Sequence, residues 1–341
     1  LLSEHVFLAA MATQNALGGN TPGFEAAAAA LGGNTEDLAG LVGSVYPDVQ
    51  APFNELWASH ITMFVDYTQG IAANDTAKAD DAVQRLTTYS QTLADTFQQV
   101  TGLPATASQP LILTHVTTLK TVVDKQKAGD FAGAYTDLRT AMGHMDTIAQ
   151  PLANAIATQQ GITGTIDSPA ANLQVALNGL LQEHVFLAGA ATGNALAGNT
   201  PAFEAAAAAL GANTTALSTA VGSVYPDVQA AFNELWASHI VMVVDYTTGI
   251  AANDTAKAND AVTRLTNYVG TLADTLEQVT GLPASASRGL IQDHVLTLKA
   301  AIDAQKAGDL PAAYTNLREA GGHMQAIADP LTSAIVTQQN L

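Results

Sequence analysis

The sequence predicts an all-α protein built from two tandem, homologous, antiparallel helical-bundle domains of about five or six helices each. Apolar residues recur at alternating steps of three and four, the spacing of one helix face, and strand-type alternation is nowhere sustained. A shift of 179 residues aligns Leu1–Gln160 with Leu180–Gln339 without a gap, and roughly 72% of the aligned pairs are identical. We expect domains over 1–160 and 169–341, with a linker over 161–168.

The first copy contains start and stop signals for its helices in order. An apolar stripe runs through residues 1–17, and Asn20-Thr21-Pro22 is a cap with a first-turn proline that opens a second helix. We expect Gly32-Gly33 to break this helix, with one or two further turns after it. Tyr46-Pro47-Asp48 is expected to start a helix that ends near residue 73.

The remaining helices are bounded in the same way. Asn74-Asp75-Thr76 caps a long helix that Gly102-Leu103-Pro104 stops, and Gly129-Asp130 separates two further helices, over 108–128 and 131–159. The second copy repeats this order but starts earlier. Asp167-Ser168-Pro169 predicts a first helix from Pro169 to about Leu196, about ten residues longer than its counterpart. We therefore interpret Leu1 as a processing boundary or the limit of the given sequence, and not as a natural helix start.

Composition narrows the classes of function. Acidic residues outnumber basic ones 30 to 12, for a net charge of −18, which disfavours nucleic acid and anionic membrane surfaces as partners. No apolar run approaches the roughly 18 residues that a membrane span needs. The absence of cysteine excludes disulfides, thiolate zinc sites, iron–sulfur clusters and covalently attached haem. The acidic, lysine-poor, Ala/Thr/Gly-rich composition favours an exported protein, extracellular or at the cell surface, although no signal segment is visible in this chain.

One stretch with a buried histidine occurs in both copies, over 53–73 and 232–252. In the first copy Phe53, Leu56, His60, Met63 and Tyr67 lie on a single helical stripe, which predicts that they face the core. All eight histidines of the chain form equivalent pairs at the same offset of 179, with one histidine on each of four helices per copy. The pairs are His5/His184, His60/His239, His115/His294 and His144/His323.

These histidines predict one metal site per domain. Four inward imidazoles from four helices can converge in a bundle core, and neutral imidazole suits copper, zinc and iron alike. Glu4 and its counterpart Glu183 adjoin a histidine, so they are candidates for an additional ligand or for orienting an imidazole. Duplicated methionines near the histidines, Met63/Met242 and Met145/Met324, favour copper. Haem held by two histidines is a further, less favoured alternative.

The alternative is that the histidines are hydrogen-bonded core residues and the methionines fill space. The protein would then be an extracellular structural protein, such as a subunit of a surface layer, sheath or filament that self-associates. No HExxH or ExxH spacing, phosphate loop or nucleophile elbow occurs, so no catalytic residue is predicted and a non-enzymatic role is favoured.

Several sequence blocks carry a resemblance. EHVFLA, FNELWASHI, VDYTxGIAANDTAKA and the pattern H-x3-LK…D-x-QKAGD resemble a group of exported prokaryotic helical proteins without an assigned activity. The resemblance covers each whole copy and implies export and an all-helical fold. It does not imply a reaction.

Overall fold

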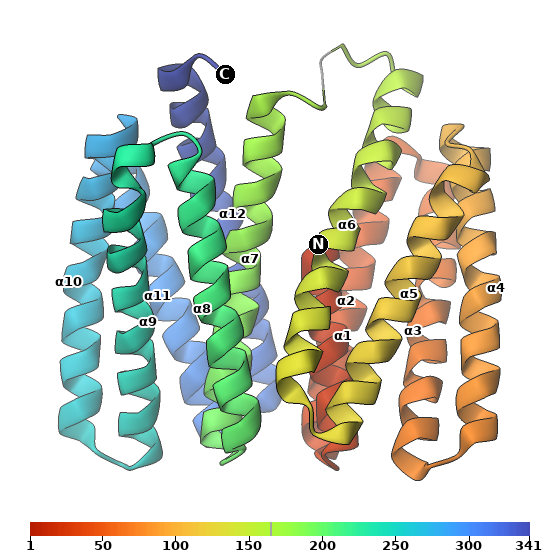
Figure 1. The fold of residues 1–341 in the computed structure, drawn as a ribbon, viewed down its shortest axis with the longest axis horizontal. Coiled ribbons are helices and arrows are strands. Elements are labelled where there is room, and N and C mark those ends of the chain that lie inside the picture. Colours follow the sequence, from red (N-terminus) through yellow and green to blue (C-terminus); the bar gives the residue numbers. More distant parts are fainter. Residues whose placement is uncertain (164–165) are drawn as a thin grey trace. The chain divides into compact units, whose positions relative to one another are not determined.

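The computed structural model describes residues 1–163 and 166–341, and every regular element in this part of the chain is helical (Figure 1). It contains twelve α-helices and two short 3₁₀ helices, and no strand occurs among the described residues. The prediction of an all-α protein is confirmed. The chain divides into two compact units, Leu1–Ile166 and Asp167–Leu341. Residues 164 and 165 of the predicted linker lie outside the described residues.

Each unit contains six α-helices and one 3₁₀ helix. The helices of the first unit are α1 (Leu2–Leu17), α2 (Thr21–Val45), η1 (Pro47–Val49), α3 (Gln50–Ala73), α4 (Thr76–Thr101), α5 (Ala105–Ala128) and α6 (Phe131–Gln159). Those of the second are α7 (Pro169–Leu196), α8 (Thr200–Gly222), η2 (Pro226–Val228), α9 (Gln229–Ala251), α10 (Thr255–Thr280), α11 (Ala284–Ala307) and α12 (Leu310–Gln339).

The expected caps form where the sequence places them. The side chains of Asn20, Asp75 and Asp130 each accept a hydrogen bond from the backbone N–H three residues on, at 3.2, 3.0 and 2.9 Å. Gly102 and Gly129 end α4 and α5 in the left-handed conformation, with φ of 78° and 76°. These local signals fix most of the helix boundaries.

The predicted break at Gly32-Gly33 is wrong, because α2 runs through these residues without interruption. Buried positions continue at helical spacing across them, from Leu31 to Asn34 and Leu38. The Asn34 side chain is fully buried and donates hydrogen bonds to the Leu1 carbonyl and to Glu4 Oε2, both at 3.0 Å. Tertiary contacts on both sides of the glycines outweigh the low helix propensity of the pair.

Three other boundaries refine the expected ones. The chain first forms η1 at Pro47, so α3 starts at Gln50 and not at Tyr46. Helix α5 starts at Ala105, three residues before the predicted start. The start of α7 at Pro169 is confirmed, with Ser168 Oγ accepting from the Ala171 N–H at 3.1 Å. Helix α7 has 28 residues and α1 has 16.

Helix α1 occupies the interior of its unit. It packs against α2, α3, α5 and α6, and residues 4–10 are buried without a break around the whole helix. Helix α7 has the same neighbours in its own unit, namely α8, α9, α11 and α12. An apolar sequence on all sides suits a helix enclosed by others, whereas α3 and α4 bury a single stripe. No helix in the described part of the chain is long and apolar enough to cross a membrane.

A close helix crossing gives a test of this packing. A Cβ atom at Gly70 of α3 would lie 2.8 Å from the backbone nitrogen of Ala79 and 3.1 Å from its Cα, both in α4. We expect Gly70→Ala to lower the free energy of unfolding by about 1–3 kcal/mol, because the two backbones must separate. Urea denaturation followed by circular dichroism measures this change.

Gly40→Ala is the matched control, because Gly40 lies on the exposed side of α2 and no atom lies within 4 Å of the position that an added Cβ would take. It should stabilise the protein by about 0.5–1 kcal/mol through the better helix propensity of alanine. Equal stability of the two variants would contradict the close crossing of α3 and α4.

Candidate functional site

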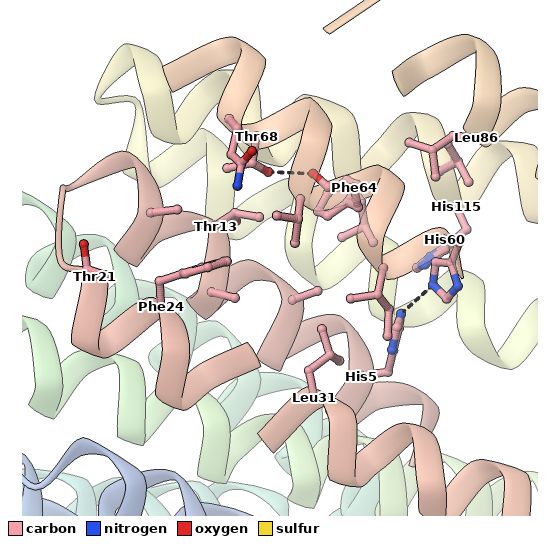
Figure 2. Close-up of a pocket in the computed structure, with 18 residues that line it drawn as sticks. His5, Thr13, Thr21, Phe24, Leu31, His60, Phe64, Thr68, Leu86 and His115 are labelled. Atoms are coloured by element: carbon pink, nitrogen blue, oxygen red, sulfur yellow. Dashed lines mark hydrogen bonds between the residues drawn. The ribbon is translucent and has the colours of Figure 1, made fainter. Parts of the chain in front are cut away.

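Three of the four predicted histidines of the first unit meet in its core (Figure 2). His5 comes from α1, His60 from α3 and His115 from α5, and all three side chains are buried. The Nε2 atoms of His5 and His60 lie 3.3 Å apart, and the ring centroids of His5 and His115 are separated by 6.4 Å. The second unit repeats the arrangement with His184, His239 and His294. The Nε2 atoms of His184 and His239 lie 3.2 Å apart, and the ring centroids of His184 and His294 are separated by 6.3 Å.

The fourth histidine lies at the edge of this cluster. His144 on α6 is partly buried, and its Nδ1 lies 3.5 Å from the Thr118 hydroxyl of α5. A charge on His144 would lower the pKa of His115 further. His323 has the corresponding position in the second unit and acts on His294.

The buried glutamates take part in a different contact. Glu4 Oε2 accepts a hydrogen bond from Asn34 Nδ2 at 3.0 Å, and Glu183 Oε2 accepts one from Asn213 Nδ2 at 2.6 Å. Each pair joins the interior helix to the next helix along the chain. Among the described residues, no group of three or more His, Asp or Glu side chains is placed to hold a metal ion. The side chains in direct contact at the centre of each site are therefore two imidazoles.

The distance between the two Nε2 atoms can be compared with the distance between donor nitrogens in a metal site. Metal–nitrogen bonds of about 2.0–2.1 Å at a tetrahedral angle place two donor nitrogens about 3.3–3.4 Å apart. The two imidazoles of each unit are hydrogen-bonded through their Nε2 atoms at 3.3 and 3.2 Å, distances that also match this value. Haem bound between two histidines would need nitrogens about 4 Å apart on opposite faces of the porphyrin. The Nε2 atoms of the two pairs lie closer than this, at 3.3 and 3.2 Å.

Burial keeps the imidazoles neutral. Desolvation lowers the pKa of His60 to about 4 and that of His115 to about 3, although backbone carbonyls of Trp57 and Ala141 act in the opposite direction. The pKa of His5 is lowered well below its ordinary value, first by desolvation and then by the neighbouring imidazoles. A neutral imidazole has a free lone pair, which is the form that binds a metal.

Two aromatic side chains border the pair. The Trp57 ring stands edge-on to both imidazoles, with centroids 5.2 Å from His5 and 4.9 Å from His60. The Tyr89 ring stacks on His60 at 4.9 Å, and its buried hydroxyl has no hydrogen-bond partner among the described residues. Neither Trp57 nor Tyr89 is among the site residues predicted from the sequence. Their duplication as Trp236 and Tyr268 was the one signal that linked them to the histidines.

A cavity of about 190 Å³ leads away from the cluster in the first unit (Figure 2). Alanine, leucine, valine and phenylalanine side chains form most of its wall. The hydroxyls of Thr13 and Thr68 donate to backbone carbonyls of their own helices, so they add little free polarity. The three histidines lie at one end, and the exposed residues Thr21 and Gln69 also line the cavity. It connects the imidazoles with the surface.

Neither a protein-family model nor a curated protein nor a solved structure matches the chain. The description of the protein therefore rests on its fold and on the geometry of the histidine cluster. It is an all-helical protein in which each compact unit buries three neutral imidazoles, two of them in contact.

The lowered pKa values predict how stability depends on pH in the metal-free protein. Each buried imidazole is neutral when folded and has an ordinary pKa near 6.5 when unfolded, so the unfolded state binds more protons between pH 6.5 and about 4. Stability is complete above pH 6.5 and falls as the pH drops through this window. Each histidine contributes up to about 1.4 kcal/mol per pH unit.

Chemical denaturation with chelator present, between pH 7.5 and pH 5, measures this slope before most carboxylates titrate. The double variant His60→Gln, His239→Gln lacks one buried histidine in each half of the chain. Each loss should reduce the slope of stability against pH by up to about 1.4 kcal/mol per pH unit. An unchanged slope in this variant would show that His60 titrates in the folded protein as it does in the unfolded chain.

Proposed function

We propose that the protein binds transition-metal ions, one in each unit, through the pairs His5–His60 and His184–His239. The observation that supports this most directly is the contact of two neutral imidazoles at the nitrogen–nitrogen separation of a tetrahedral metal site, repeated in both units. In the metal-free pair one Nε2–H donates to the other Nε2, and a bound cation would replace that hydrogen bond as the shared partner of both imidazoles.

The other predicted residues lie at different distances from the imidazole pair and have different roles in this proposal. His115 and His294 supply a third nitrogen after a local rotation of the ring, since each is buried and about 6.4 or 6.3 Å from its neighbour. His144 and His323 lie at the rim and serve as outer positions. Glu4 and Glu183 add buried carboxyl groups beside the interior histidines and hold α1 to α2 and α7 to α8 through an asparagine.

Copper fits the surroundings best among copper, zinc and iron. Met324 lines the same cavity as His239 and His294, and its counterpart Met145 is buried at 3% exposure. A soft thioether near imidazoles favours copper. The cavity of the first unit gives an ion, or a small molecule bound to it, a path to the pair.

We further propose that the two units are tandem copies of one antiparallel bundle domain in an exported, non-enzymatic protein. The shared helix order and the paired contacts at the offset of 179 residues support the duplication. The acidic, lysine-poor and cysteine-free composition supports export. The role that these properties suit is the binding and carriage of a metal outside the cytoplasm.

Copper titration followed by tryptophan fluorescence tests the site directly. The chain has two tryptophans, and each ring centroid lies within 5.2 Å of two imidazoles of its site. A bound Cu²⁺ ion quenches an indole at such short range, so most of the emission should be lost at two equivalents per chain. Zn²⁺ should compete for the same sites without quenching.

Single and double substitutions provide the controls. His60→Gln should halve the capacity to one ion per chain, and the double variant with His239→Gln should bind at least about 100-fold more weakly. His144→Gln should retain both sites. Stoichiometric binding of two ions by a helical double variant would contradict the proposal.

A further inference from the structure

The cavity of the first unit has the size of a small organic molecule. Its volume is about 190 Å³, and the side chains of α1, α2, α3, α4 and α5 that form its wall are mostly apolar. An apolar cavity of about 150 Å³ engineered in another protein stays dry and takes up benzene. The cavity of this protein therefore has room for one aromatic ring with a small substituent.

The wall favours a neutral aromatic occupant. Phe24 of α2 and Phe64 of α3 both line the cavity (Figure 2). Edge-on or offset contacts between aromatic rings add to the free energy that burial of their area supplies. None of the described residues in this wall is charged, so an ionised ligand would be buried there without a counter-charge, at a high desolvation cost.

The third imidazole offers a hydrogen-bond acceptor. His294 Nδ1 of the second unit lies 3.4 Å from the Ala320 carbonyl oxygen, and because a carbonyl can only accept, this nitrogen has the proton. The Ala141 carbonyl acts on His115 in the same way in the first unit. In a neutral imidazole with a proton on Nδ1, the lone pair is on Nε2. His115 Nε2 is thus an acceptor.

The position of His115 relates this acceptor to the cavity. Its Nδ1 is directed to the carbonyl of Ala141 on α6, and none of the described residues of α6 lines the cavity. His115 itself does line it. His5 and His60 are already hydrogen-bonded to each other through their Nε2 atoms. The nitrogen that remains to receive a proton donor in the cavity is therefore Nε2 of His115.

We propose that this cavity binds a small neutral phenol, with the ring against Phe24 and Phe64 and the hydroxyl donating to His115 Nε2. A phenol has an ordinary pKa near 10, so it enters the cavity without charge and donates one hydrogen bond. The exposed residues Thr21 and Gln69 of the wall lie where the ligand enters. This binding requires no metal ion and goes beyond the metal site proposed above.

Phenol and toluene are matched probes, because they have nearly the same size and shape and differ in the hydroxyl. Isothermal titration of the full chain at pH 7.5, with chelator present, should show saturable binding of phenol. His115→Leu removes the acceptor and keeps most of the bulk. It should lower the preference for phenol over toluene at least about fivefold, since the hydroxyl loses its partner. Toluene should still bind this variant, which would show that the cavity persists.

A pair of alanine substitutions locates the site. Ala12 lines the cavity and is 4% exposed, so Ala12→Leu fills part of the space that the ring needs. This variant should bind one phenol molecule fewer per chain than the parent protein. Ala58→Leu makes the same change at an exposed position of α3 outside the cavity wall, and it should leave phenol binding unchanged. Circular dichroism checks that both variants are helical.

Benzoate tests the requirement for a neutral ligand. It has the same ring but a full negative charge, and it should bind at least about tenfold more weakly than phenol. The proposal is overturned if the folded chain shows no saturable phenol binding, or if His115→Leu leaves the preference for phenol over toluene unchanged. Because chelator is present in every titration, these results do not depend on whether the pair His5–His60 holds a metal ion.

Discussion

The enclosure of one helix by four others is the constraint on which each unit depends. Residues 4–10 of α1 are buried around the whole helix, so every neighbouring helix must present an apolar stripe to it. Polar groups on such a helix must find partners inside the core. Glu4 finds Asn34 of α2, and His5 finds His60 of α3. The candidate site is a direct result of placing an imidazole on the most enclosed helix.

Periodicity, caps and prolines in the sequence were sufficient to predict most helices and the early start of α7. They were insufficient at Gly32-Gly33, where local propensity favours a break but Leu31, Asn34 and Leu38 are held in the core on both sides. Propensity is a local quantity, and the stabilisation of α2 comes from residues distant in the sequence, such as Leu1 and Glu4.

The site could be predicted only in part for a related reason. A helical stripe indicates that His5, His60 and His115 face inward, but their separation depends on helix spacing, rotation and side-chain rotamers. The contact of two Nε2 atoms and the 6.4 Å to the third ring therefore emerge only in three dimensions. His144, predicted to face inward like the others, is only partly buried and lies at the edge of the cluster. Adjacency in sequence was a poor guide for Glu4, because consecutive helical residues point about 100° apart.

The neutrality of the buried imidazoles would bear on the oxidation state of an ion bound in the way that we propose. Nitrogen donors without charge leave the full charge of a cation inside an apolar core, and the electrostatic cost of that charge grows with its square. A monovalent ion carries about one quarter of the cost of a divalent one. Such surroundings would favour the cuprous over the cupric state of a bound copper ion and shift the reduction potential of the couple upwards. The helices that bury these imidazoles would thereby also select the oxidation state of a copper ion bound between them.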